Sequence, residues 1–157
     1  MVEQKLPEIV VPKGKAVFWM DQFGRWHNQH GPFEHKKVID YFNSCIRKDK
    51  DGYFLGQIRD DHFEKVYFKY EQTPLFVVDA IIETTPATVE LILNTTQKLM
   101  LDPEQLFIRS DNLYIQKEDE IVRFTDRVLL KLSSFIIVEE DRYYLEINGK
   151  RHAIDEK

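Results

Sequence analysis

The feature that most constrains the fold is a stretch of sequence that recurs 90 residues further along the chain. Residues 37–55 align with residues 127–145 without a gap, and each copy reads as a helix, an acidic turn and a strand. A duplicated unit keeps such positions because each helix must bury its apolar side against its own strands. The identical pairs are Val38/Val128, Ser44/Ser134, Ile46/Ile136, Asp51/Asp141, Tyr53/Tyr143 and Leu55/Leu145.

This repeat predicts an α+β fold of two similar small halves, each with mostly antiparallel strands and one main helix. The alternative is that unrelated helix–turn–strand segments resemble each other through shared physics. We expect an N-terminal extension at residues 1–14, an N-terminal half at 15–100 and a C-terminal half at 101–157. The extension contains Pro7, Pro12 and Gly14 and has only a short apolar run.

Two segments have apolar residues at helical spacing. The first, near His35 to Arg47, predicts one buried stripe. The second is expected to begin at Glu118, because acidic residues suit a helix N-terminus. The first stripe is Val38, Ile39, Phe42, Cys45 and Ile46, and the second helix is expected to contain Glu118, Asp119, Glu120, Ile121, Phe124, Val128, Leu132 and Phe135.

Between and after these helices the sequence is typical of strands. Asn148-Gly149 is a strong hairpin signal, because both central residues of that turn need a positive φ. Residues 106–109 and 113–117 frame a second expected hairpin, and Thr85-Pro86 separates two β-branched runs.

Composition and charge limit the classes of partner that this chain is expected to bind. The net charge is −5, and the basic cluster at residues 47–50 has acidic neighbours, so nucleic-acid binding is not expected. No apolar run approaches the ~20 residues of a membrane helix, and no signal peptide opens the chain. We therefore expect a cytoplasmic protein that binds no membrane. A lone cysteine, Cys45, allows no internal disulfide and reads as a buried hydrophobe.

Two polar clusters could carry chemistry. His27, His30 and His35 lie within nine residues, but alternation along a strand points the first two to opposite faces. We interpret them as a solvated loop and expect no bound metal. Asp61, His62 and Glu64 could perform acid–base chemistry if a pocket brought them together, but an ordinary turn explains them as well.

Nucleotide-binding devices are absent from the sequence. None of the six glycines is spaced as Gly-x-Gly, and neither a phosphate loop nor a nucleophile elbow occurs. No cofactor and no catalytic residue are therefore assigned.

An ordered series of short motifs resembles the bacterial domain-of-unknown-function family 1285. The resemblance covers most of the chain from Trp26 onward. Its motifs are Trp26 and Gly31, Asp51-Gly52-Tyr53 with Leu55, Glu64-Lys65-Val66, residues 69–79, Leu113-Tyr114-Ile115 and Tyr143 to Ile154.

The chain also departs from the pattern of that family. Arg59-Asp60 stands where the family has threonine-proline, and Glu71-Gln72 lacks the second acid of a glutamate-aspartate pair. The resemblance implies an α+β fold of two similar halves and no established activity.

These observations predict an uncharacterised bacterial protein that works as a non-catalytic module with a regulatory or signalling role. Its partner would be an unknown small molecule or a protein, and its oligomeric state is left open. Two similar halves would form a cleft between them, where small ligands bind. The alternative is a hydrolase that uses one of the two His-containing clusters. The expected cleft residues are Trp26, Lys65, Tyr70, Glu71 and Thr73.

Overall fold

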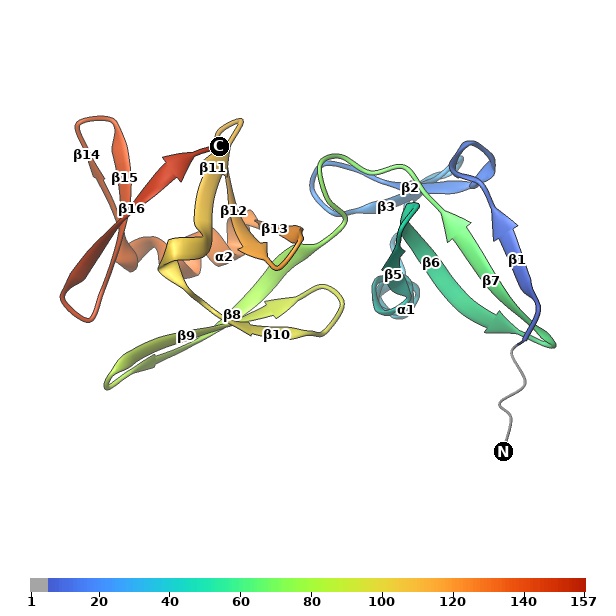
Figure 1. Cartoon of the computed structure of the whole chain (residues 1–157), viewed down its shortest axis with the longest axis horizontal. Coiled ribbons are helices and arrows are strands. Elements are labelled where there is room, and N and C mark those ends of the chain that lie inside the picture. Colours follow the sequence, from blue (N-terminus) through green and yellow to red (C-terminus); the bar gives the residue numbers. More distant parts are fainter. Residues whose placement is uncertain (1–5) are drawn as a thin grey trace. The chain divides into compact units, whose positions relative to one another are not determined.

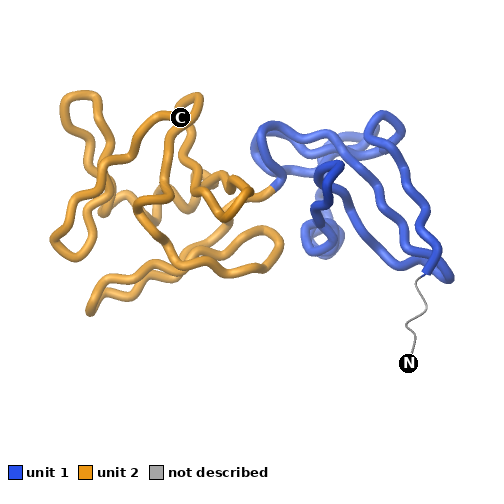
Figure 2. Tube along the Cα trace, viewed as in Figure 1, with its two compact units in different colours: residues 1–74 blue, residues 75–157 orange. Residues whose placement is uncertain are grey.

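The computed structural model describes residues 6–157 and divides into two compact units, 1–74 and 75–157 (Figure 2). The division lies between Pro74 and Leu75, whereas the sequence suggested one after residue 100. Residues 1–5, the start of the expected N-terminal extension, lie outside the described part. Residues 6–157 form sixteen strands and two α-helices, so the expected α+β class is confirmed (Figure 1).

Unit 1 contains a four-stranded sheet in the order β1-β7-β6-β5 (Figure 1). It also contains a three-stranded sheet in the order β2-β3-β4. A single parallel bridge between Trp19 and Lys69 joins β2 to the segment after β7. In chain order the elements are β1 (Glu8–Val11), η1 (Lys13–Lys15), β2 (Phe18–Met20), β3 (Trp26–Asn28), β4 (Gly31–Pro32), α1 (Lys36–Ser44), β5 (Ile46–Asp49), β6 (Gly52–Arg59) and β7 (His62–Tyr67).

Part of the expected N-terminal extension belongs to the sheet of unit 1. Glu8–Val11 forms β1, which pairs in parallel with β7. The core of unit 1 is aromatic: Trp26 and Phe68 are fully buried, with ring centroids 4.9 Å apart. Phe42 of α1 adds a third ring, whose centroid is 5.4 Å from that of Trp26.

The stripe expected on the first helix is only partly buried. Cys45 and Ile46 are buried, but both follow the end of α1. Ile39 and Phe42 are half-buried. Val38 is 42% exposed, so its expected burial is wrong. Val38 lies in the first turn of α1, where it lines a shallow, open surface pocket.

Unit 2 is built on one nine-stranded sheet in the order β10-β9-β8-β13-β12-β11-β16-β15-β14. Most neighbours are antiparallel, but β11 pairs in parallel with β16 and β8 in parallel with β13. Its elements are β8 (Phe76–Thr84), β9 (Ala87–Leu93), β10 (Lys98–Met100), η2 (Pro103–Gln105), β11 (Leu106–Arg109), β12 (Asn112–Lys117), β13 (Glu120–Phe124), α2 (Asp126–Leu132), η3 (Ser133–Phe135), β14 (Ile136–Glu139), β15 (Arg142–Ile147) and β16 (Lys150–Glu156).

The second helix begins later than the sequence suggested. Glu118 has a φ of 55° and lies in the turn between β12 and β13, so the acidic run belongs to a hairpin rather than to a helix N-terminus. Val122 and Phe124 are both buried on strand β13, which is period-two alternation. Ile121 and Phe124 are three residues apart, and this spacing alone does not distinguish a strand from the edge of a helix. The helix itself spans only Asp126–Leu132.

Tight hairpin turns connect most of the strands of unit 2. Asn148 and Gly149 have φ values of 53° and 75°, which confirms the expected turn between β15 and β16. Ser110 and Asp111, with φ values of 50° and 63°, form the equivalent turn between β11 and β12. Within residues 6–157, no helix is long and apolar enough to cross a membrane.

Candidate functional site

Unit 1 contains an amphipathic cavity of about 460 Å³. Strands β6 and β7 form one wall, helix α1 the second, and the segment from η1 into β2 the third. Its apolar lining is Val11, Ala16, Val17, Phe18, Phe42 and Val66, and its polar lining is Lys15, Tyr41, Gln57, Arg59 and Glu64.

Strand alternation explains why these side chains meet. In β6, Gln57 and Arg59 point to the same face because they are two residues apart. Gln57 lies opposite Glu64 in the antiparallel pairing of β6 with β7, and Val66 lies two residues beyond Glu64 on the same face. Tyr41 and Phe42 approach this face from α1.

A chain of polar contacts runs along one side of the cavity. The Tyr41 hydroxyl donates to the Gln57 side-chain oxygen at 3.2 Å. The Gln57 amide donates to Glu64 Oε1 at 3.1 Å, and Arg59 Nε lies 3.7 Å from the same oxygen. These four residues therefore hold one another in place, while the opposite side of the cavity is apolar.

The charges around the cavity favour an anionic group. Lys15 and Arg59 are cationic, and Glu64 is the one acid among the lining residues. A hydrogen bond with the Cys45 thiol, together with partial burial, raises the pKa of Tyr41, although the Arg59 charge opposes this. The phenol therefore keeps the proton that it donates to Gln57.

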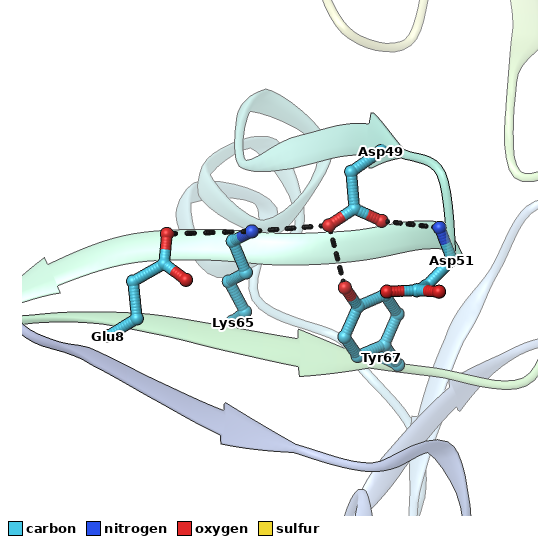
Figure 3. A network of polar contacts seen from close by, with 5 residues as sticks. All are labelled: Glu8, Asp49, Asp51, Lys65 and Tyr67. Atoms are coloured by element: carbon cyan, nitrogen blue, oxygen red, sulfur yellow. Dashed lines mark hydrogen bonds and ion pairs between the residues drawn. The ribbon is translucent and has the colours of Figure 1, made fainter.

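A second polar cluster lies on the other face of the same sheet (Figure 3). Asp49 Oδ2 accepts a hydrogen bond from Tyr67 at 2.7 Å and from Lys65 at 3.2 Å, and Lys65 also lies 3.6 Å from Glu8. The hydrogen bond to Asp49 raises the pKa of Tyr67 to about 12. The same bond lowers the pKa of Asp49, and the Asp49 carboxylate raises the pKa of Lys65.

This cluster fixes the strand that carries Glu64. Lys65 and Tyr67 alternate with Glu64 and Val66 along β7, so the cluster and the cavity use opposite faces of one strand. The Lys65 ammonium also lies 5.0 Å from the centre of the Phe54 ring. The Lys65 ammonium and the Asp49 carboxylate are each held by several partners. We therefore interpret this cluster as a structural support for β7.

The five residues expected to line a cleft all belong to unit 1, and the structure gives them different surroundings. Trp26 is 1% exposed, and its indole N–H donates to Asn43 at 2.8 Å. Lys65 belongs to the cluster around Asp49. Tyr70 packs against Phe68 and Tyr53, Glu71 is exposed and Thr73 is buried. Their role as a ligand cleft stays a prediction.

The three histidines near the start of the chain do not converge. His27 pairs with Asp21 at 2.7 Å and stacks on Trp19. His30 lies beside Gln29, and His35 is the N-cap residue of α1. In the described part of the chain, no three His, Cys, Asp or Glu side chains are grouped as metal ligands would be.

The second His-containing cluster is also open. Asp61 lies 3.6 Å from His62 but its side chain is 98% exposed. Glu64 faces Gln57 and Arg59 instead. This geometry lacks the chain of partners that a catalytic base needs for orientation.

Sequence reasoning missed Tyr41, Gln57 and Arg59. One signal was present in the sequence. Tyr41 is adjacent to the apolar stripe expected on the first helix, so its ring could be expected at the border of the surface that the stripe packs against. Gln57 and Arg59 carry no motif, and only the register of β6 against β7 brings them to Glu64.

The fold is similar to two solved structures. A DUF1285 family protein from Silicibacter pomeroyi DSS-3 matches with a TM-score of 0.62 and 12% sequence identity, over 96% of this chain and 83% of that one. A DUF1285 family protein from Shewanella baltica OS155 matches with a TM-score of 0.52 and 18% identity, over 75% of this chain and 91% of that one. No family model and no curated protein matches the chain. The resemblance seen in the sequence is therefore confirmed at the level of the fold, which is DUF1285-like.

Proposed function

We propose that this chain is a non-catalytic binding module whose unit 1 cavity takes a small amphipathic molecule with an anionic head. The observation that carries the proposal is the pairing of an apolar side with the contact chain from Tyr41 to Arg59. Small-molecule sites are mostly apolar, have a few fixed polar groups, and typically measure roughly 300–1,000 Å³. The cavity of about 460 Å³ lies within that range.

The direction of the ligand follows from the charges. An aliphatic body would contact Val17, Phe18 and Val66, and a carboxylate would lie near Lys15 and Arg59. Glu64 already accepts from Gln57 and pairs with Arg59, so it leaves the second cation, Lys15, less neutralised. Octanoate combines such a body with such a head.

Isothermal titration and thermal unfolding with octanoate, octanol and octylamine test this proposal. We expect octanoate to bind with one site per chain and to raise the unfolding temperature, because a ligand of the folded state stabilises it. Octanol should bind more weakly and octylamine most weakly. Equal binding of all three, or binding of none, would contradict the proposal.

Arg59→Gln removes the cation with little change in size and should weaken octanoate binding by about tenfold. Arg142→Gln is the matched control, because Arg142 is an exposed arginine on a strand of unit 2 and is not among the residues that line this cavity. An equal loss in both variants would show that the ligand senses only the net charge.

We further propose that the two units are copies of one plan, and three observations support this. The order strand-strand-strand-helix-strand-strand-strand occurs from β2 to β7 and again from β11 to β16. Helices α1 and α2 begin 90 residues apart, as do β5 and β14. The parallel bridge between Trp19 and Lys69 in unit 1 has the same place as the pairing of Phe107 with Asp155 in unit 2.

A regulatory or signalling role and a cytoplasmic location stay predictions. Both would follow naturally for a module that binds a metabolite without transforming it. The five expected cleft residues are tested separately from the cavity: substitution of exposed Glu71 by Gln should leave octanoate binding unchanged if the cavity is the site, and should weaken it if the cleft is.

A further inference from the structure

Unit 2 has a cavity of its own, of about 280 Å³, which plays no part in the site proposed above. The hairpin of β11 and β12, helix α2 and strands β14–β16 surround it. Tyr143, on its border, is 44% exposed. The apolar lining is Ile108, Leu113, Leu129, Ile136, Tyr143 and Ile154.

The pairing of strands identifies the matching positions in unit 1. Met20 pairs with Trp26 between β2 and β3, and Ile108 pairs with Leu113 between β11 and β12. Because Trp19 and Phe107 make the matching parallel bridges, Met20 corresponds to Ile108 and Trp26 to Leu113. The same bridges make Phe68 the counterpart of Ile154.

In unit 1 these positions are filled by aromatic rings. Trp26 and Phe68 are 1% and 0% exposed, and their rings pack against each other. Tyr53, the counterpart of Tyr143, is 8% exposed because the Tyr70 ring packs edge-on against it at 5.6 Å. The place that corresponds to the unit 2 cavity is therefore occupied by side chains of unit 1 itself.

In unit 2 the same positions carry smaller side chains. Leucine replaces tryptophan at residue 113, isoleucine replaces phenylalanine at residue 154, and Glu156 stands where unit 1 has Tyr70. Removing ring volume from a close-packed core without a compensating change leaves a void lined by the remaining apolar atoms. The cavity therefore lies where aromatic side chains fill the core of unit 1, and no aromatic side chain of unit 2 fills it.

We propose that this cavity binds a small molecule with an indole-like aromatic ring, which takes the place that the Trp26 side chain has in unit 1. The inference rests on the proposed correspondence of the two units and not on the unit 1 cavity. Apolar cavities of this kind bind aromatic rings of matching size. Tyr143 offers an edge or face to the ring, as Tyr53 does to Tyr70.

The rim of the cavity gives the ligand a preferred charge. Asp111 is the one charged residue among the lining residues, and it lies in the exposed turn between β11 and β12. The neighbouring Asn112 side chain is occupied by hydrogen bonds with Arg123 and with the backbone oxygen of Ser110. An amine on the ligand would therefore be favoured by Asp111, and a carboxylate would be repelled.

Isothermal titration with indole, tryptamine and indole-3-acetate tests both parts of the proposal. We expect one site per chain, with tryptamine binding several-fold more tightly than indole-3-acetate, and with indole between them. Asp111→Asn should remove the difference between the two charged probes. No binding of any of the three at millimolar concentration would overturn the proposal.

A variant whose own side chain fills the unit 2 cavity tests whether indole binds there. Leu113→Trp restores the residue of unit 1 and should weaken indole binding by about tenfold or more. Leu130→Trp is the matched control, because Leu130 belongs to the same unit and is 76% exposed. This variant should bind indole as the parent does. Ile154→Phe, the counterpart of Phe68, provides a second filled cavity if Leu113→Trp fails to fold.

Two further outcomes would overturn the assignment. Unchanged indole binding in a folded Leu113→Trp or Ile154→Phe variant would place the ring elsewhere. A dimer that indole dissociates, seen by sedimentation, would show that a second copy of the chain covers this cavity. Arg59→Gln, which tests the unit 1 cavity, should leave indole binding unchanged, so the two proposals fail separately.

Discussion

Each unit has a cation over an aromatic ring beside a carboxylate, on three successive strands that correspond to each other under the proposed repeat. In unit 1 these are Lys65, Phe54 and Asp49. In unit 2 they are Arg151, Tyr144 and Glu139, and the ring and the acid lie 90 residues after their counterparts. The cation lies 5.0 Å from the ring centre in unit 1 and 5.4 Å in unit 2.

The two clusters differ in how far neighbouring side chains shield them from solvent. The Lys65 side chain is 18% exposed and that of Arg151 is 41% exposed. Tyr67 covers the unit 1 cluster and donates to Asp49, whereas the corresponding residue of unit 2 is Ala153. Arg151 compensates with a second acid, Glu146, at 3.3 Å. The same three groups are thus partly enclosed in one unit and open to solvent and salt in the other, which predicts different contributions to stability.

The largest difference is expected between the two cores. Trp26→Ala removes a fully buried ring, and we expect a loss of about 3–5 kcal/mol in the free energy of unfolding. Leu113→Ala, at the corresponding position beside an existing cavity, should cost about 2 kcal/mol. Denaturant titration followed by circular dichroism measures both. Because Trp19 and Trp26 both belong to unit 1, fluorescence of the remaining Trp19 assigns the first loss to that unit. Equal losses would contradict the difference in packing.

A smaller effect is expected from the phenol that covers the unit 1 cluster. Tyr67→Phe leaves Asp49 without its shortest hydrogen bond and should cost about 1–2 kcal/mol. Tyr144→Phe in unit 2 is the matched control and should be nearly neutral. Denaturant titration at neutral pH measures both variants.

Alkaline pH sharpens the same comparison. The folded pKa of Tyr67 is about 12, above the unfolded value of 10, so the folded state holds this proton more tightly. Its contribution to stability is fully present below pH 10 and is lost as the pH rises toward 12. Tyr67→Phe should therefore lose less stability than the parent between pH 10 and pH 12. For Asp49 the folded pKa is lowered, so its contribution is lost as the pH falls below about 4.

The smallest effects concern the cations themselves. Lys65→Met should lower the midpoint of denaturant unfolding more than Arg151→Met does, because the Lys65 cluster is better shielded from solvent. Raising the ionic strength should shrink the effect of Arg151→Met and leave that of Lys65→Met largely unchanged. The opposite salt response would mean that enclosure does not distinguish the two clusters.

Local patterns in the sequence were sufficient for some of the strands and turns. Asn148-Gly149 correctly predicted the turn between β15 and β16. The apolar stripe that ends at Cys45 and Ile46 predicted the bounds of α1 to within a few residues. They failed where two periodicities overlap. Residues 121 and 124 suit either a helix or a strand, and the choice was made by pairing of β13 with β12 and β8, which no local pattern contains.

The candidate cavity depended even more on distant pairings. Glu64 was singled out from the sequence as an acid, but its partner Gln57 comes from the register of β6 with β7. Trp26 was expected to line a cleft because tryptophan suits ligand walls. Its burial in the structure depends on Phe68 and Asn43, which contact the indole and lie far from it in the sequence.

The succession of hairpins also has a consequence for how the chain folds. Most strand pairs join neighbours across a turn of two residues or a few more, so their contacts are local and close with little loss of chain entropy. The exceptions are the parallel pairs β1/β7, β8/β13 and β11/β16, whose partners are separated by long stretches of chain. We expect the hairpins to form before the transition state and these parallel seams to close after it. Substitutions that weaken only the β11/β16 pairing should then mainly speed unfolding, and substitutions in β15, such as Leu145→Ala, should mainly slow folding.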